Sequence, residues 1–211
     1  LSNSGQICNA LTRILVPENR AADFTDALAA EMTAMIVGDP ADSATQVGPL
    51  VTQRQQQRVR QYIEIGRHEG ARLVVGGATM PVGIERGWYV RPTVFADADN
   101  SMRIAREEIF GPIAAVIPVD DYDEALTVTN DTEYGLTAGI VTSSLARATH
   151  FRRNARTGCV MVNLPTAGTD YHVPFGGRKN SSYGPREQGR YAAEFYTQVK
   201  TAYIRAGTPE I

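Results

Sequence analysis

The start of the chain holds a cysteine, Cys8, whose surroundings would suit a nucleophilic thiol. Asn3, Ser4 and Gly5 are residue types that begin helices, and apolar residues follow them at a spacing of four. The pattern predicts a short helix with Cys8 in or near its first turn. Backbone N–H groups and the helix dipole there would favour the thiolate, and an N–H beside the sulfur would stabilise an oxyanion. The alternative is that Cys8 is a small buried apolar residue, as many free cysteines are.

Two further strings hold residue types that suit a ligand site. Residues 107–112 read Glu-Glu-Ile-Phe-Gly-Pro, in which a carboxylate can accept two hydrogen bonds from a vicinal diol and an aromatic ring can position a flat group. Residues 174–181 read Pro-Phe-Gly-Gly-Arg-Lys-Asn-Ser, where paired glycines allow close backbone approach. Taken alone, the first string also fits a solvated acidic helix end before a turn, and the second fits a glycine-rich turn.

The elements that must position these strings alternate between strands and helices. Helical spacing is found over residues 20–36, 52–68, 122–129, 143–154 and, more briefly, within 186–196. Strands are predicted over residues 13–16, 72–75, 113–119, 136–141 and 159–162, and Pro92 predicts an edge strand or a bend within 88–95. The polar face of the helix over 52–68 is interpreted as solvated surface. The alternation of predicted strands and helices over residues 113–162 indicates βαβ units. The predicted fold class is therefore α/β, a Rossmann-like parallel sheet flanked by helices.

The last part of the chain differs in character. Residues 163–190 are rich in Gly, Pro, Ser and Tyr, which indicates a long loop. A final strand is predicted over 199–204, and a strand at a chain end needs a partner edge that another subunit can supply. We therefore expect a main domain, residues 1–196, and a C-terminal oligomerisation strand and tail, residues 197–211. A homo-oligomer that forms through this strand is expected.

The composition excludes several classes of protein. The 211 residues are 43% hydrophobic and 21% charged, which is ordinary for one globular domain or two small ones. The net charge of −2 gives no general attraction to nucleic acid or to an anionic membrane, and no apolar run approaches the ~20 residues of a membrane span. Two cysteines make no disulfide framework, so a cytoplasmic location is expected, and no metal-ligand spacing is present.

Taken together, the strings resemble those of a known family. The matching strings are Asn3-x-Gly5-Gln6-x-Cys8 with Arg13, residues 107–112, and residues 174–181. In this order they resemble the motifs of the aldehyde dehydrogenase superfamily, in which the third pattern is Pro-Phe-Gly-Gly-x-Lys-x-Ser. Asn180 departs from the small residue that relatives often hold there. The resemblance covers nearly the whole chain and corresponds to the catalytic domain with its closing oligomerisation strand.

The resemblance implies roles for four residues and a cofactor, NAD or NADP. In this family the cysteine, here Cys8, attacks an aldehyde, a hydride leaves to the cofactor, and water releases the acid. The resemblance also implies that Glu108 hydrogen-bonds the hydroxyls of the nicotinamide ribose and that Phe110 packs near the nicotinamide. Phe175 would line the tunnel that admits the small-molecule aldehyde.

The loop from Pro165 to Gly189 looks more specifically like that of the 2-oxoglutarate-semialdehyde (2,5-dioxopentanoate) dehydrogenases. A carboxylated aldehyde would need a cation near the tunnel mouth, and Arg178 is close in sequence. A small acidic aldehyde is therefore the expected substrate. Lys179 and Arg186 are interpreted as structural or subunit contacts.

The family's mechanism also uses parts that we expect upstream of these residues. Its general base is a Glu in a Glu-Leu-Gly-Gly-type segment before the cysteine, and no such segment occurs in this sequence. The Asn of the oxyanion hole and the domain that binds the adenosine half of the cofactor also precede the cysteine. Because the chain starts at Leu1, directly before the motif, we expect a fragment or an excised domain that is inactive alone as a dehydrogenase.

Two other functions fit parts of the sequence. A cofactor-independent hydrolase would pair Cys8 with one of the three histidines, but it would leave Glu108 and Phe110 without a role. A non-catalytic assembly domain would form a stable oligomer with an inert Cys8. Hydrolysis of an ester or a peptide without cofactor would indicate the hydrolase.

Overall fold

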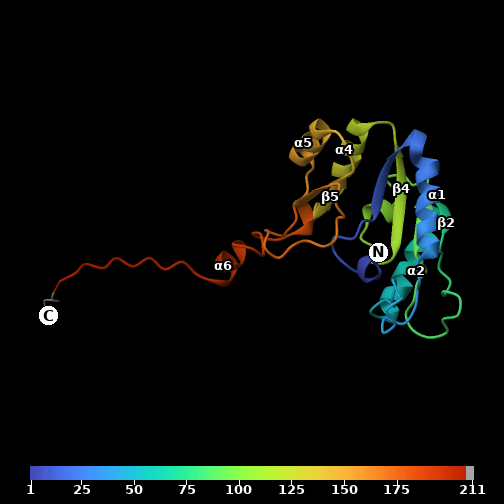
Figure 1. Ribbon diagram of the computed structural model, residues 1–211, viewed down its shortest axis with the longest axis horizontal. Helices are drawn as coiled ribbons and strands as arrows, with labels where there is room; N and C mark the ends of the chain where they lie inside the picture. Colours follow the sequence, from blue (N-terminus) through green and yellow to red (C-terminus); the bar gives the residue numbers. More distant parts are fainter. Residues whose placement is uncertain (208–211) are drawn as a thin grey trace.

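The computed structural model describes residues 1–207. It has an α/β fold with mostly parallel strands and flanking helices, as predicted (Figure 1). In chain order the elements are η1 (Ser2–Gly5), β1 (Arg13–Pro17), α1 (Glu18–Ala34), α2 (Gln53–His68), β2 (Arg72–Val75), β3 (Thr93–Ala96), α3 (Arg103–Arg106), β4 (Ile113–Val119), α4 (Tyr122–Asn130), β5 (Thr137–Ile140), α5 (Leu145–Asn154), β6 (Cys159–Val162), η2 (Lys179–Ser181) and α6 (Tyr191–Tyr196). Helices α1, α2, α4 and α5 begin and end within a few residues of their predicted bounds.

The main sheet has four strands in the order β1-β4-β3-β2. β4 pairs in parallel with β1 and β3, and β2 pairs antiparallel with β3 at one edge. Side chains alternate between the two faces of the sheet. On one face Val94 and Val116 pack with Met32 of α1, whereas on the other Phe95 and Ile117 pack with α2. The sheet is therefore buried on both faces, as the continuous apolar run of β4 predicts.

Of the two alternatives predicted for residues 88–95, an edge strand or a bend, the edge strand is wrong. Only Thr93–Ala96 of the β-rich stretch form a strand, and this strand, β3, lies inside the sheet between β4 and β2. Pro92 directly precedes the strand, so its missing N–H removes no bond from the ladder. The first strand residue is well bonded, since the N–H of Thr93 donates to the carbonyl oxygen of Pro112 at 2.8 Å.

The two short strands β5 and β6 form a separate parallel pair joined through α5. This is one of the predicted βαβ units. β4 does not pair with β5, because both edges of β4 are already occupied by β1 and β3. The elements of residues 113–162 therefore belong to two sheets, and α4 links them.

The chain ends in an extended arm that leaves the body beyond α6 (Figure 1). The strand predicted over residues 199–204 is not formed: residues 197–206 have no regular secondary structure. Val199, Tyr203 and Ile204 are each more than 90% exposed. A strand requires an edge to pair with, and none within residues 1–207 pairs with this arm. Within the same residues, no helix has the length and apolar character needed to cross a membrane.

Candidate active site

Cys8 lies in an exposed turn and not in a helix, so the predicted helix is wrong. The segment before it is the single 3-10 turn η1, in which Asn3 and Ser4 have left-handed backbone with φ of 51° and 57°. Left-handed residues cannot continue into a right-handed helix. The helix N-terminus expected beside the sulfur is therefore absent from the described residues. The exposure of Cys8 also rules out the interpretation that it is a small buried apolar residue.

Tertiary hydrogen bonds fix the turn that carries Cys8. The hydroxyl of Ser4, which is buried, donates to the carbonyl oxygen of Gly48 at 2.9 Å. The N–H of Val51 donates to Gln6 Oε1, also at 2.9 Å. Both bonds join residues 3–8, the candidate nucleophile segment, to the loop before α2, and they explain why the local helical pattern does not form a helix. Ser4 and Gln6 are therefore positioning residues, although the sequence indicates Ser4 only as a helix-starting residue and Gln6 only as part of a motif.

Gly5 brings the first and second strings together. Its φ is 74°, and a Cβ placed on it would lie 2.1 Å from the carbonyl oxygen of Gly111. Only a glycine allows the backbone of the nucleophile segment to approach the end of the 107–112 string this closely. The two strings, far apart in the sequence, are thus in direct contact at Gly5 and Gly111.

The 107–112 string presents alternate side chains inward and outward. Ile109 is only 2% exposed and belongs to the main core, whereas Glu108 is exposed and Phe110 is half-buried. The carbonyl oxygen of Glu108 accepts a hydrogen bond from Arg58 Nη2 at 2.6 Å. Gln55 Nε2 donates to the carbonyl oxygens of Ile109, at 3.0 Å, and Phe110, at 2.7 Å. The side chains of α2 therefore hold this string in place.

These contacts correct in part the interpretation of the polar face of α2 as solvated surface, because Arg54, Gln57 and Gln61 are exposed as that interpretation predicts. Gln55 and Arg58 are three residues apart, so they lie on the same face of α2. Both reach across to the backbone of the 107–112 string. No signal in the sequence distinguishes Gln55 and Arg58 from the other Gln and Arg residues of the helix. Their partners are backbone carbonyl groups, which every residue has, so no residue type marks them.

The geometry of Glu108 and Phe110 suits the group for which they were predicted. The Glu108 carboxylate is exposed and makes no hydrogen bond within residues 1–207, so both of its oxygens can accept bonds from a vicinal diol. Phe110 is anchored through its backbone and keeps part of its ring accessible. This combination fits the ribose and the flat ring of a nicotinamide nucleotide.

Glu107, the neighbour of Glu108, is the C-cap of α3, and its half-exposed carboxylate is part of a charged cluster. Arg103 Nε donates to its carboxylate at 2.9 Å, and the hydroxyl of Tyr62 donates to it at 2.5 Å. The hydrogen bond from Arg103, followed by that from Tyr62, lowers the pKa of Glu107 from 4.5 to about 2. The cluster ties α3 to α2 beside the 107–112 string.

Stability that depends on Glu107 is expected to be lost in acid. A lowered pKa means that the stabilisation is fully present above pH 4.5 and disappears as the pH falls towards 2. Because the pair is largely exposed, Glu107→Gln should cost only about 0.5–1 kcal/mol at neutral pH. Urea unfolding of wild type and variant at pH 7 and pH 3 measures this cost. An equal difference in unfolding free energy between wild type and variant at the two pH values would contradict the lowered pKa assigned to Glu107.

Arg13, the arginine that follows the nucleophile, has a structural role. It is half-buried, and Nη1 donates to Asn100 Oδ1 at 2.6 Å and to the carbonyl oxygen of Val128 at 3.0 Å. Burial, reinforced by nearby Arg106, lowers its pKa. Arg13 therefore joins β1 to the C-terminal end of α4.

The third string lies close to the start of β6, where a Cβ placed on Gly158 would lie 1.8 Å from the carbonyl oxygen of Gly176. The N–H of Phe175 donates to the carbonyl oxygen of Glu187 at 2.8 Å, and the reverse bond is 2.9 Å long. Lys179 Nζ donates to the carbonyl oxygens of Asn130, at 2.7 Å, and Thr132, at 2.9 Å. Arg186 Nη1 donates to the carbonyl oxygen of Gly177 at 2.6 Å. Lys179 and Arg186 thus make structural contacts within the chain, as predicted.

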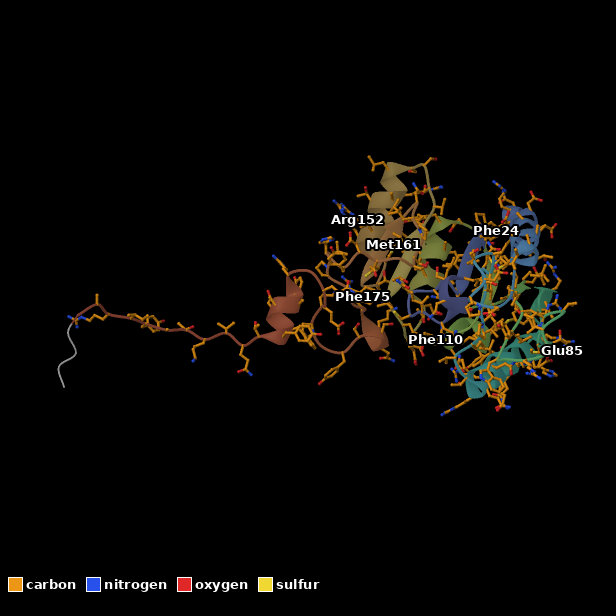
Figure 2. The ribbon with its side chains drawn as sticks, turned by 60° about the horizontal axis from the view of Figure 1, so that its bottom comes forward. Phe24, Glu85, Phe110, Arg152, Met161 and Phe175 are labelled. Atoms are coloured by element: carbon orange, nitrogen blue, oxygen red, sulfur yellow. The ribbon has the colours of Figure 1, made fainter. Side chains whose placement is uncertain are left out.

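The structure does not join the third string to Cys8. Within residues 1–207 no hydrogen bond links residues 174–181 to the nucleophile segment. In Figure 2, Phe175 lies towards the base of the C-terminal arm, and Phe110 lies apart from it on the body of the molecule. The structure therefore brings the first two strings together, and the tunnel position of Phe175 stays a prediction.

The three histidines do not form a dyad with Cys8. His150 Nδ1 lies 2.8 Å from the hydroxyl of Tyr122, and His172 Nδ1 lies 2.7 Å from Asp170 Oδ1. His68 is an exposed residue at the end of α2. Among residues 1–207 no hydrogen bond joins a histidine to the cysteine. The geometry gives the hydrolase alternative no support.

The sequence and fold place the chain in a family. Residues 1–202 match the model of the aldehyde dehydrogenase family, so the chain belongs to that family. It is 42% identical over 201 residues to a putative aldehyde dehydrogenase of Staphylococcus haemolyticus and 44% identical over 205 residues to a betaine aldehyde dehydrogenase of Agrobacterium fabrum. These matches cover 95% and 97% of this chain, but only 42% and 41% of the relatives.

Solved structures agree with this assignment. An aldehyde dehydrogenase of Mycobacterium tuberculosis in complex with NAD+ superimposes with a TM-score of 0.89 at 42% identity, over 98% of this chain and 42% of that one. A Cys-to-Ala mutant of aldehyde dehydrogenase C from Pseudomonas syringae, in complex with NAD+ and octanal, gives a TM-score of 0.87 at 43% identity. That match covers 92% of this chain and 39% of the other.

Proposed function

We propose that this chain is the catalytic portion of an NAD(P)-dependent aldehyde dehydrogenase and that Cys8 is its nucleophile. The observation that carries the proposal is the contact at Gly5 and Gly111, which joins the segment of an exposed, anchored cysteine to the Glu108–Phe110 string. Family membership supports it, as do the NAD+ complexes of the M. tuberculosis and P. syringae proteins.

The chemistry assigned to Cys8 is covalent catalysis in two stages. The thiolate forms a bond to the carbonyl carbon of the aldehyde, and the carbonyl electron pair moves to oxygen. Loss of hydride from that carbon restores the carbonyl as a thioester on Cys8. Water then attacks the thioester, the C–S bond breaks, and the acid leaves while the thiolate is restored. NAD(P)+, when bound, supplies the acceptor for the hydride.

The other site residues hold and orient the cofactor and the aldehyde. We assign Glu108 to the ribose hydroxyls and Phe110 to the nicotinamide ring, because one is an exposed carboxylate and the other a half-buried aromatic side chain. Phe175 is assigned to the wall of the aldehyde tunnel on the strength of its motif. The general base and the adenosine-binding domain are assigned to a segment outside these residues.

A comparison of two proteins tests the proposal. The native protein that carries these residues should form NAD(P)H from aldehydes, whereas the isolated 211-residue chain should be slower by roughly 10²–10⁴ for each absent base or oxyanion donor. Both are assayed by absorbance under the same conditions. Robust turnover by the isolated chain would contradict the assignment of the base to another segment. Ester hydrolysis without cofactor, and no aldehyde oxidation by the native protein, would favour the hydrolase.

For the substrate we propose a small acidic aldehyde of the 2-oxoglutarate-semialdehyde type. The support is the loop from Pro165 to Gly189 and the exposed cation Arg178 within it. Some relatives are betaine aldehyde dehydrogenases, whose name indicates a cationic aldehyde, so the charge of the substrate is the property to test. A higher kcat/KM for the acidic aldehyde than for neutral and cationic analogues supports the proposal, and a preference for the cationic one contradicts it.

We propose that the arm of residues 197–211 associates with another copy of the chain. Its described part is extended, and Val199, Tyr203 and Ile204 expose apolar surface that an isolated chain leaves in water. Deletion of residues 197–211 should convert the oligomer to a smaller species, because each arm would lose its partner edge. Light scattering after size-exclusion chromatography measures the mass. A control that lacks only 208–211 should keep the oligomer, and an unchanged mass after the longer deletion would contradict the role of the arm.

We also propose a reducing compartment, the cytosol, for this protein. Both cysteines are free, Cys8 in the exposed turn and Cys159 half-buried at the start of β6. Only the thiolate is a nucleophile, so Cys8 must stay reduced to act. Thiol titration of protein purified without reductant tests this: two reactive thiols per unfolded chain support the proposal, and fewer contradict it.

A further inference from the structure

We propose that the C-terminal end of α4, residues 128–132, is a joint that sets the position of the third string, and with it Phe175, relative to the segment that carries Cys8. Lys179 of the third string and Arg13 of β1 are the two positioning residues of this joint. The inference rests on the function proposed above for Cys8 and Phe175. Because no hydrogen bond links the two strings directly within the described residues, their relative position depends on an element that contacts both.

Successive carbonyl groups at the end of α4 carry the inference. Arg13 donates from its two terminal nitrogens to the carbonyl oxygens of residues 128–129, at 3.0 and 3.2 Å. Lys179 Nζ donates to the carbonyl oxygens of Asn130, at 2.7 Å, and Thr132, at 2.9 Å. A residue of the nucleophile strand and a residue of the third string therefore bind neighbouring groups of the same helix end.

The charges at this helix end explain why it gathers cations. The last carbonyl groups of a helix have no partner within it and carry partial negative charge. Asp131, the C-cap of α4, adds a carboxylate, which accepts a hydrogen bond from Arg106 Nη1 at 2.9 Å. Burial lowers the pKa of Lys179, and the positive charges of Arg156 and Arg13 lower it further, so the two positioning residues are close enough to repel each other. The helix end and its carboxylate supply the negative charge that keeps both in place.

The backbone of the third string follows the segment directly after the joint. The N–H of Asn180 donates to the carbonyl oxygen of Glu133 at 3.0 Å, and the N–H of Arg178 donates to that of Gly135 at 2.8 Å. In the opposite direction, the N–H of Gly135 donates to Ser181 Oγ at 2.9 Å. A movement of the end of α4 would therefore move the third string with it.

Both functional residues are close in sequence to the joint. Lys179 comes four residues after Phe175, and Arg13 comes five residues after Cys8. The backbone of Arg13 is fixed in β1, which pairs with β4 in a register that places Arg13 opposite Ala115. A shift at the joint would thus change the position of the proposed tunnel wall relative to the nucleophile without altering either side chain.

Lys179→Met tests the inference, because it keeps a long side chain but removes the ammonium group that binds the two carbonyls. Arg152→Met is the matched control, since Arg152 is an exposed cation in the last turn of α5 and makes no hydrogen bond within the described residues. In the native protein, the KM for aldehyde should rise roughly 10-fold for Lys179→Met at nearly unchanged kcat, because a wall of the tunnel contacts the substrate equally before and during the reaction. Lys179→Arg, which retains the charge and the donors, should restore most of the loss, and Arg152→Met should keep the wild-type KM.

A double variant tests whether the two positioning residues act through the same helix end. Arg13→Lys retains the charge but loses the fork that binds two carbonyls, so it should also raise the KM for aldehyde. Because both residues act on one joint, the double variant with Lys179→Met should raise KM by less than the product of the two single effects. A rise equal to that product would show independent action and would contradict the joint.

Two further readouts separate this role from general damage. In Lys179→Met, amide hydrogen exchange over residues 174–181 should speed up, whereas the Kd for NAD+ and NADP+ and the rate of Cys8 alkylation by iodoacetamide should keep their wild-type values. Unchanged KM for aldehyde would overturn the inference, even if exchange were faster. A loss of cofactor affinity or of Cys8 reactivity as large as the rise in KM would also overturn it. Failure of the wild-type protein to oxidise any aldehyde would instead overturn the proposed function.

Discussion

Aldehyde oxidation by the native protein should fall by roughly 10⁴-fold or more when Cys8 is replaced by alanine, because removal of a covalent nucleophile leaves only binding and electrostatic effects. Cys8 is exposed in a turn that Ser4 and Gln6 anchor, so alanine at this position disturbs no packing. The steady-state rate of NAD(P)H formation and the rate of labelling by iodoacetamide both measure the loss. Urea unfolding should show the same stability as wild type.

Cys159→Ala is the matched control. The Cys159 sulfur is half-buried and lies 3.9 Å from the carbonyl oxygen of Gly176, a long and weak contact. This variant should keep its rate of aldehyde oxidation within a few-fold of wild type. Equal losses in the two variants, or substantial oxidation by Cys8→Ala, would contradict the assignment of the nucleophile.

The second large effect is expected for Gly5→Ala. The added Cβ would lie 2.1 Å from the carbonyl oxygen of Gly111 and would require an L-residue to adopt a φ of 74°. Overpacking and left-handed backbone together should cost roughly 2–5 kcal/mol of unfolding free energy. The variant should also lose activity, because the nucleophile segment must move away from the 107–112 string. Urea unfolding and the Cys8 labelling rate measure the two consequences.

Gly70→Ala separates the cost of the close contact from the cost of the left-handed backbone. Gly70 has a φ of 98°, but no atom lies within 4 Å of a Cβ placed there. Its substitution should therefore cost only about 1–2 kcal/mol, the price of the backbone conformation. If Gly5→Ala were no more destabilising than Gly70→Ala, the close contact between the two strings would not matter for stability.

Elements whose patterns reflect their own burial could be predicted from the sequence. The apolar run of β4 identified a strand buried on both faces, and the spacing in α2 located its buried face at Val59 and Ile63. The side chains of Asp121 and Ser144 bond the first turns of α4 and α5, and both are residue types that favour the start of a helix. Each of these patterns is local, and the structure confirms the helices and the strand that they predict.

Features that depend on distant partners could not be predicted. The segment before Cys8 has a helical pattern, but bonds from Ser4 to Gly48 and from Val51 to Gln6 impose a turn. Gln55 was interpreted as surface because its partners are backbone carbonyls, which no sequence pattern distinguishes. The predicted C-terminal strand finds no edge among the described residues.

The same limit applies to the candidate site. The resemblance supplied Cys8, Glu108, Phe110 and Phe175, and the structure shows a direct contact only between the strings of the first three. That contact depends on the absence of a side chain at Gly5, which the local sequence pattern indicates only as a helix-starting residue. The donors on α2 add a layer of support that only the folded geometry reveals.

The most direct test of the central claim is the mass of the peptide that contains Cys8 after rapid acid quench of the native protein during turnover with aldehyde and NAD(P)+. Acid slows hydrolysis of a thioester, so a covalent intermediate should survive digestion. The account predicts that Cys8 carries the acyl group of the substrate and that the modification is absent without cofactor. An acyl group on another residue, or an unmodified Cys8 in protein whose turnover is demonstrably limited by hydrolysis, would contradict it.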